Sequence, residues 1–208
     1  MENIKLDSKF ITLEGVDGAG KSTCINFIKK YLADKKLKSI FTREPGGTLL
    51  GEKLREILLH DKITPETETL LMFAARNEHI QQVIKPNLQS GLNVISDRFT
   101  DATYAYQSGG RYVEMKKITI LRNWVHGELN PDLTLLFDLP IDVSLARLKS
   151  NGHLDKFEKE AADFHIRIKD SYLALAKKEP DRFEVIDSNQ NISNIEKEIY
   201  LVLDKLFL

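Results

Sequence analysis

The stretch FITLEGVDGAGKSTCINFIKKYL, residues 10–32, limits what this chain can fold into more than any other part of the sequence. A β-rich run leads directly into a loop with the pattern G-x-x-x-x-G-K-[ST], and residues with helical spacing follow. A strand, a glycine-rich loop and a helix in this order are typical of a site that binds the phosphates of a nucleoside triphosphate. The residues that we expect to form this site are Gly15, Val16, Asp17, Gly18, Ala19, Gly20, Lys21, Ser22 and Thr23.

The glycines of this loop let successive backbone N–H groups point inward toward one anion. The helix that follows begins at the bound phosphates, so its dipole adds to the attraction. We expect Lys21 to reach the terminal phosphates and the hydroxyl of Ser22 to bind Mg²⁺. A glycine turn that matches the pattern by accident is the alternative, and the strand and helix on either side argue against it.

Short apolar runs alternate with longer stretches of helical spacing along the chain. We expect strands at 9–14, 38–42, 93–97, 132–140 and 182–188. We expect helices at 22–36, 49–60 and 63–91, and an amphipathic terminal helix that carries Ile192, Ile195, Ile199, Val202 and Leu206. This alternation implies right-handed crossovers, and it predicts an α/β fold with a central parallel β-sheet flanked by helices on both faces. The sequence contains no repeat, low-complexity tract or linker, so we expect residues 1–208 to form a single domain.

The composition argues against several classes of protein. Thirty basic residues against thirty-one acidic ones give a net charge of −1, whereas a protein that binds a nucleic-acid backbone usually carries a basic excess. The single cysteine, Cys24, cannot form an internal disulfide and fits a reducing compartment. No run of about 18 or more apolar residues is present, and MENIKLDSKF lacks the apolar core of a signal peptide. We therefore expect a soluble, cytoplasmic protein with no nucleic-acid or membrane partner.

Arginines follow two of the expected strands, at the edge where ligands gather in doubly wound sheets. FTREPGGT places Arg43 directly after the second strand, and ISDRF places Asp97 and Arg98 directly after the third. Arginine can bind a phosphate through two parallel N–H groups. Asp97 is placed to hold Mg²⁺ directly or through water.

A phosphate loop alone does not name a reaction, since kinases, GTPase switches and ATPase motors all carry one. The N-K-x-D motif expected of a GTPase is missing from the sequence, and a motor would usually need a larger body. Two placed arginines favour a small kinase, because phosphoryl transfer depends mainly on positioning and on charge stabilisation of a phosphate-bearing acceptor.

Four motifs together resemble a known family. EGVDGAGKST, FTREPGGT, DRFTDATYAYQSGGR and PDLTLLFDL occur in the order and spacing seen in thymidylate kinases, particularly the bacterial branch. The resemblance implies the P-loop kinase fold with a small lid segment, and transfer of the γ-phosphoryl group of ATP to dTMP with Mg²⁺, which yields dTDP for dTTP synthesis. Two alternatives stay open: another small P-loop nucleoside or nucleotide kinase, and a non-catalytic nucleotide-binding switch.

The resemblance also implies roles for individual residues toward dTMP. Arg43 and Arg98 are expected to hold the acceptor phosphate and to act in catalysis with Lys21. Asp17 is expected to contact the 3′-hydroxyl region of the acceptor sugar. The remaining positions that match the nucleoside pocket are Thr103, Tyr106 and Gln107.

The expected helix at 63–91 matches the family segment that supplies a base-contacting arginine and a base-stacking aromatic ring. Arg76 is the arginine by this match. The aromatic position of many relatives corresponds to Met72 here, and Phe73 is one residue later. We expect Phe73 to pack on the base, and packing of Met72 is the alternative.

The lid is expected at about 147–160, where the sequence is charge-rich and contains a glycine. Bacterial relatives bring a cation over the phosphates from this lid, often an arginine at the position of Asn151. Because Asn151 is uncharged, the expected lid cation is Arg147, with Lys149 and Lys156 as alternatives. Thymidylate kinases are typically homodimers, so we expect a homodimer, and we expect Trp124 in the core or at an interface.

Overall fold

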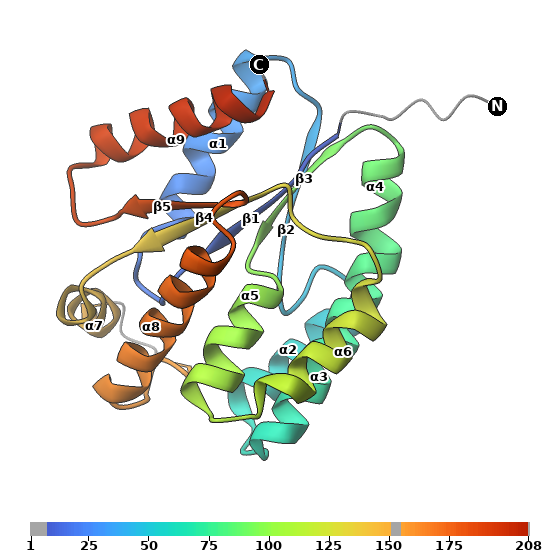
Figure 1. Ribbon diagram of the computed structural model, residues 1–208, viewed down its shortest axis with the longest axis vertical. Helices are drawn as coiled ribbons and strands as arrows, with labels where there is room; N and C mark the ends of the chain where they lie inside the picture. Colours follow the sequence, from blue (N-terminus) through green and yellow to red (C-terminus); the bar gives the residue numbers. More distant parts are fainter. Residues whose placement is uncertain (1–7, 151–154, 208) are drawn as a thin grey trace.

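The computed structural model describes residues 8–150 and 155–207, which form a layered α/β structure (Figure 1). Within these residues the central sheet has five parallel strands in the order β2-β3-β1-β4-β5. The strands are β1 (Phe10–Glu14), β2 (Ser39–Arg43), β3 (Asn93–Asp97), β4 (Leu133–Asp138) and β5 (Phe183–Asp187). Each lies where the alternating pattern predicted a strand, and the predicted α/β class is confirmed.

The connections between the strands are helical. The helices are α1 (Lys21–Asp34), α2 (Leu49–His60), α3 (Pro65–His79), the π-helical turn η1 (Ile80–Ile84), α4 (Lys85–Gln89), α5 (Thr100–Thr103), the π-helical turn η2 (Tyr104–Gly110), α6 (Met115–His126), α7 (Ile141–Ser150), α8 (Ala162–Lys178) and α9 (Ile192–Phe207). In Figure 1, α1 and α9 lie on one side of the sheet, whereas α5 and α8 lie on the other. This follows from right-handed crossovers, since the chain moves from β1 outward to β2 and then back across the sheet to β5. No helix in the described ranges has the length and apolar character needed to cross a membrane.

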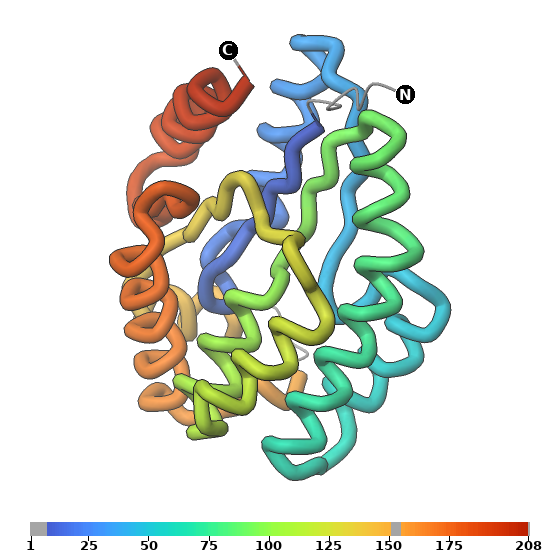
Figure 2. The backbone as a smooth tube through the Cα atoms, turned by 45° about the vertical axis from the view of Figure 1, so that its right-hand side comes forward, coloured from blue at the N-terminus to red at the C-terminus, as the bar shows by residue number. Residues whose placement is uncertain are grey.

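The helix predicted at 63–91 is present as one continuous rod of α3, η1 and α4 (Figure 2). Its amino end is capped by Thr64, whose side chain accepts a hydrogen bond from the backbone N–H of Thr67 at 3.3 Å. Pro65 occupies the first turn, where backbone N–H groups have no acceptor within the helix. The N–H that proline lacks therefore costs no hydrogen bond. This rod carries several side chains of the site along one side.

The terminal helix α9 packs against α1 as its amphipathic pattern predicted. Ile195, Ile199 and Val202 are buried, and the rings of Tyr31 and Tyr200 lie 5.4 Å apart between the two helices. This apolar contact anchors α1, and therefore the phosphate loop that precedes it, to the carboxyl end of the chain.

The structure does not place Trp124 in the core. This side chain is 81% exposed on α6, and Ile120, one turn earlier, is 60% exposed. The same helix buries Ile118, which faces the protein. Residues four apart share one helical face, so Trp124 and Ile120 form an apolar strip that points away from the core. The expectation of a core position is wrong, and that of an interface stays a prediction.

Candidate active site

The phosphate loop connects the buried strand β1 to α1 and has the backbone that its glycines allow. Gly15 has a φ of 137°, and a Cβ there would lie 2.5 Å from the carbonyl oxygen of Phe137. Gly20 precedes the first residue of α1 with a φ of 89°. Lys21 is buried, and its Nζ donates hydrogen bonds to the carbonyls of Gly15 and Val16, each at 3.0 Å. The loop thus folds around the ammonium group of its own lysine.

Helix α7 supports the other side of the loop. The hydroxyl of Ser144 donates to the carbonyl of Asp17 at 2.6 Å, and Nη1 of Arg147 donates to the carbonyl of Gly18 at 3.1 Å. Arg147, the first lid candidate, therefore lies against the loop. Lys149 is exposed and does not line the loop cavity.

The third lid candidate, Lys156, lies elsewhere. Its Nζ lies 3.0 Å from Oε2 of Glu68 and donates to the carbonyl of Asp61 at 3.2 Å. Asn151, where relatives often carry arginine, lies outside the described residues. Of the three predicted cations, Arg147 is the one that the structure brings to the phosphate loop.

A cavity of about 680 Å³ opens over the loop. This volume is usual for a small-molecule site. Loop residues from Asp17 to Thr23 line it, together with Arg43, Asp97 and Arg98 from the ends of β2 and β3. Gly15 and Val16 begin the loop and contribute through their carbonyls, which accept from Lys21, rather than by lining the cavity. The arginines predicted from strand ends thus face the same space as the loop.

Arg98 faces the phosphate loop directly. Its Nη1 donates to the carbonyl of Gly15 at 3.0 Å and to the hydroxyl of Tyr172 at 3.1 Å. Its Nη2 contacts the carboxylate of Asp17 and donates to the hydroxyl of Tyr106 at 2.9 Å. The backbone of Arg98 has a φ of 69°, a left-handed conformation that a non-glycine residue adopts only at a cost.

The pKa of Asp17 reflects these neighbours. Burial alone would raise the pKa of this carboxyl, but the charges of Arg98 and Lys21 and the hydroxyl of Tyr106 lower it to about 2. Tyr106 donates to Oδ2 of Asp17 at 2.6 Å. Asp17 is therefore ionised at neutral pH and offers acceptor oxygens at the rim of the loop.

Two more arginines stand near this point. Arg43 is half-exposed and forms an ion pair with Glu52 at 2.9 Å. Arg55 donates to the carbonyl of Pro45 at 3.0 Å and lines the loop cavity as well. Arg55 lies on α2 and not directly after a strand, so the strand-end pattern does not predict it.

Asp97 has a buried oxygen, Oδ1, that has no hydrogen-bond partner within the described parts of the chain. Ser22 lines the same cavity with an exposed side chain. The described residues contain no group of three or more His, Cys, Asp or Glu side chains that could hold a metal ion. A carboxylate and a hydroxyl that line one cavity with a phosphate loop suit Mg²⁺, which is usually bound by few protein ligands together with substrate phosphates and water.

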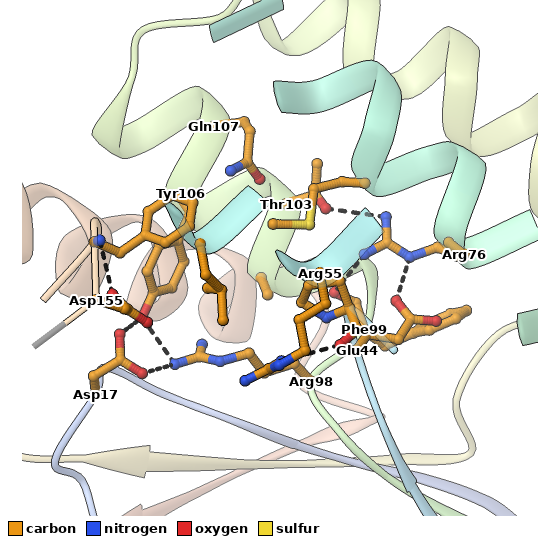
Figure 3. A pocket seen from close by; sticks show the side chains of 15 residues that line it. Asp17, Glu44, Arg55, Arg76, Arg98, Phe99, Thr103, Tyr106, Gln107 and Asp155 are labelled. Carbon is orange, nitrogen blue, oxygen red and sulfur yellow. Dashed lines mark hydrogen bonds and ion pairs between the residues drawn. The ribbon is translucent and has the colours of Figure 1, made fainter. Parts of the chain in front are cut away.

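A second cavity adjoins the first and is the one drawn in Figure 3. Both cavities are lined by Asp17, Glu44, Arg55 and Arg98, so these residues stand where the two spaces meet. The second cavity continues from there toward the predicted nucleoside residues, which are Arg76, Thr103, Tyr106 and Gln107. The structure thus brings these four positions together.

Arg76 is fully buried at one wall of the second cavity. Its Nε donates to Glu44 at 2.6 Å, its Nη1 to Thr103 at 3.0 Å and its Nη2 to the carbonyl of Phe99 at 3.1 Å. Glu44 also contacts the ring of His79 at 2.8 Å. This carboxylate, which follows Arg43 in the sequence, therefore orients the predicted base-contacting arginine.

Phe73 does not line the second cavity, whereas Met72 does. The ring of Phe73 packs instead in a separate apolar cluster with Val113 and Ile118, and the guanidinium of Arg76 lies over it at 5.0 Å. Successive residues of a helix point about 100° apart. The helix α3 therefore directs Met72 into the cavity and Phe73 into the core, which corrects the predicted placement of Phe73.

Two cavities adjoin one another, one over the phosphate loop and one lined by the predicted nucleoside residues. This arrangement is typical of an enzyme that phosphorylates a nucleotide. A family model described as thymidylate kinase matches residues 13–199. The chain belongs to the thymidylate kinase family.

Curated thymidylate kinases are similar to this chain over nearly all of their length. The one from Methylobacillus flagellatus is 56% identical over 191 residues, which cover 92% of this chain and 94% of that protein. The one from Neisseria meningitidis serogroup B is 52% identical over 205 residues, covering 96% and 98%. Among solved structures, thymidylate kinase from Ehrlichia chaffeensis matches with a TM-score of 0.77 at 34% identity, covering 95% of this chain and 98% of that one. The P-loop kinase fold expected from the motifs is confirmed.

The segment before α8 adds two side chains that the sequence motifs do not single out. Asp155 and Phe157 line the second cavity. The ring of Phe157 meets that of Tyr106 edge to face, with centroids 5.8 Å apart. In the sequence, the one signal for Phe157 is its apolar character among charged neighbours.

Proposed function

We propose that this protein transfers the γ-phosphoryl group of ATP to dTMP and so forms dTDP, as a step in dTTP synthesis. The observation that carries the proposal is the meeting of the two cavities at Arg98 and Asp17. A triphosphate on the loop and a monophosphate in the adjoining cavity would meet at this point, which is what direct in-line transfer requires.

The donor side is built from the phosphate loop. Backbone N–H groups of the loop and the amino end of α1 hold the phosphates, and Lys21 supplies a fixed positive charge. Arg147, held at the carbonyl of Gly18, adds a second cation from α7. These groups stabilise the charge that spreads over the transferred phosphoryl group.

The acceptor side is built from the strand-end arginines. Arg98 binds the phosphate of dTMP, Arg55 adds positive charge at the same junction, and Arg43 adds positive charge from the loop cavity. The acceptor oxygen of a phosphate is already anionic, so the transfer needs neither a covalent intermediate nor a strong general base. Preorganised cations therefore account for the chemistry.

Ser22 and Asp97 would hold Mg²⁺, since both line the loop cavity and Oδ1 of Asp97 is unpaired among the described residues. When bound, Mg²⁺ supplies positive charge that is shared between the terminal phosphates of ATP. Asp97 owes its position to β3, which pairs with both β1 and β2.

The nucleoside side reads thymidine by shape and by hydrogen bonds. Asp17 and Tyr106 lie at the sugar end of the cavity, and Met72 and Phe157 give apolar walls for the base. Arg76 presents N–H donors to a carbonyl of the pyrimidine, and Gln107 faces its edge. The acceptor site would therefore prefer a pyrimidine deoxynucleotide.

We also propose a cytoplasmic homodimer that forms through α6. The support is the apolar strip of Trp124 and Ile120, because large apolar side chains exposed side by side mark interaction surfaces. Met115 is 49% exposed at the start of the same helix. Sedimentation of the unaltered chain and of the W124E variant tests this, since the variant should be monomeric at a concentration where the unaltered chain is a dimer.

An acceptor screen tests the proposed activity. ATP, Mg²⁺ and each nucleoside monophosphate in turn are supplied, and nucleoside diphosphate is measured. We expect dTMP to be the best acceptor by kcat/KM. Another preferred acceptor would make the protein a different small kinase, and no diphosphate with any acceptor would make it a nucleotide-binding switch.

A further inference from the structure

A buried carboxylate stands behind the nucleoside cavity and belongs to none of the motifs that point to the function. Glu68, on the first turn of α3, is 1% exposed. Its Oε1 accepts a hydrogen bond from Nε2 of Gln107 at 2.9 Å. The two residues are 39 positions apart in the chain, and the fold alone brings them together.

Two cations flank this carboxylate. Nζ of Lys156 lies 3.0 Å from its Oε2, and Nε of Arg111 lies 3.7 Å from its Oε1. Lysine and arginine side chains carry only N–H donors. Both oxygens of Glu68 therefore face donors, with Lys156 at Oε2 and with Arg111 and the Gln107 amide at Oε1.

This arrangement determines how the amide of Gln107 is turned. The NH₂ group must face Glu68, so the carbonyl oxygen, Oε1, must face the other way. Gln107 lines the nucleoside cavity, where Figure 3 draws its amide above the space between Tyr106 and Thr103. No described residue donates a hydrogen bond to this carbonyl oxygen.

An acceptor presented to a pyrimidine selects for a base that can donate. The N3 position of thymine and of uracil carries a hydrogen, whereas N3 of cytosine carries a lone pair. We propose that Glu68 is a positioning residue that determines specificity, because it turns the Gln107 carbonyl toward the base and so favours bases with an N3–H group. This inference rests on the proposed function, since it concerns the acceptor of that same reaction.

Arg76, which lines the same cavity, strengthens the same selection. Its guanidinium offers N–H donors, which match the O4 carbonyl of thymine and oppose the N4 amino group of cytosine. The cavity therefore offers a donor group from Arg76 and an acceptor from Gln107, the two kinds of group that an imide edge can pair with. A site built for specific hydrogen bonds rejects a base that leaves its buried polar groups unpaired.

Two variants isolate the role of Glu68. The double variant E68M/K156M replaces a buried ion pair with apolar side chains of similar length, a change that proteins often tolerate. It frees the Gln107 amide to turn, while Arg111 keeps its other partner, Glu160. The control variant K156M removes only the lysine and leaves Glu68 bonded to Gln107.

The readout is kcat/KM for dTMP, dUMP and dCMP with ATP, for the unaltered protein and for both variants. In E68M/K156M the dTMP-to-dCMP ratio should fall about tenfold, the value of one hydrogen bond gained or lost. The dTMP-to-dUMP ratio should stay within about twofold, because both bases carry N3–H. In K156M both ratios should stay within about twofold.

An unchanged dTMP-to-dCMP ratio in an active E68M/K156M protein would overturn the role of Glu68, since a purely structural residue would lower all three acceptors together. If the double variant unfolds at the assay temperature, E68Q replaces it, because a glutamine can donate as well as accept and no longer dictates the amide's direction. If the unaltered protein fails to phosphorylate dTMP, the proposed function itself is wrong, and the two failures are therefore distinct.

Discussion

Arg98 and Asp17 form an ion pair at the rim of the phosphate loop, with Nη2 of the arginine on Oδ1 of the aspartate. The same guanidinium donates to the carbonyl of Gly15, which is also an acceptor for Lys21. One set of contacts thus ties the loop to the end of β3. The arginine proposed to hold the acceptor phosphate is therefore positioned by the loop that holds the donor.

Replacing Arg147 with alanine should lower kcat by about tenfold to a hundredfold, because one preorganised cation at the transferred phosphoryl group is lost. The matched control is K149A, which removes an exposed cation two residues away on the same helix and should change kcat by about twofold or less. Steady-state kinetics with ATP and dTMP provides both values. Equal kcat for the two variants would remove Arg147 from the mechanism.

The motifs of the sequence predicted the parts of the site that follow strands directly. Asp97 and Arg98 lie at the carboxyl end of β3, and Lys21 ends the loop that follows β1; parallel strands bring these ends to one edge. Alternation of apolar runs and helical stretches was enough to predict the five strands of the described residues, because each contains a short β-rich stretch between helical segments.

The parts that sequence reasoning missed depend on packing between distant elements. Arg55 reaches the site from the middle of α2. Glu68 contacts Gln107, which is 39 positions later in the chain. The sequence predicts Phe73 at the base, whereas Met72 lines the cavity. One residue turns a helical side chain by about 100°, and no motif specifies that phase. Trp124 is exposed because its apolar strip lies opposite the buried face of α6.

Replacing Asp97 with asparagine should raise the Mg²⁺ concentration for half-maximal activity by about tenfold or more, because a carboxylate oxygen available to the ion is lost. The measurement is initial rate against Mg²⁺ at a fixed, saturating concentration of ATP and dTMP. The D34N variant is the control, since Asp34 lies at the far end of α1 and lines neither cavity. A lower kcat with an unchanged Mg²⁺ dependence would show that Asp97 has another role.

Glu14 should make the stability of the protein depend on pH. This buried carboxyl accepts the backbone N–H of Phe99 and the hydroxyl of Tyr172, each at 2.7 Å. Burial, assisted by the charge of Asp101, raises its pKa from 4.5 to about 8. Between these two values the folded state binds more protons than the unfolded state, so the contribution of Glu14 to the free energy of unfolding falls as pH rises.

The variant E14Q removes this contribution. Urea titration measures the free energy of unfolding of both proteins. Between about pH 4.5 and about pH 8, the value for E14Q minus the value for the unaltered protein should increase as pH rises. Above that range this difference should stay constant. Burial lowers the pKa of His126 to about 3, which makes stability rise with pH. Because both proteins contain His126, this contribution cancels in the difference. A difference that is the same at every pH would show that Glu14 titrates alike in both states.

Binding of dTMP and of thymidine to the variant R98M, measured by calorimetry, tests most directly whether Arg98 holds the acceptor phosphate. The variant R122M, which alters an arginine of α6 that lines neither cavity of the site, is the control. We expect the Kd for dTMP to rise by about tenfold to a hundredfold in R98M, with a change of about threefold or less for thymidine, which has no phosphate. Equal weakening of dTMP and thymidine, or no weakening of either, would contradict the account.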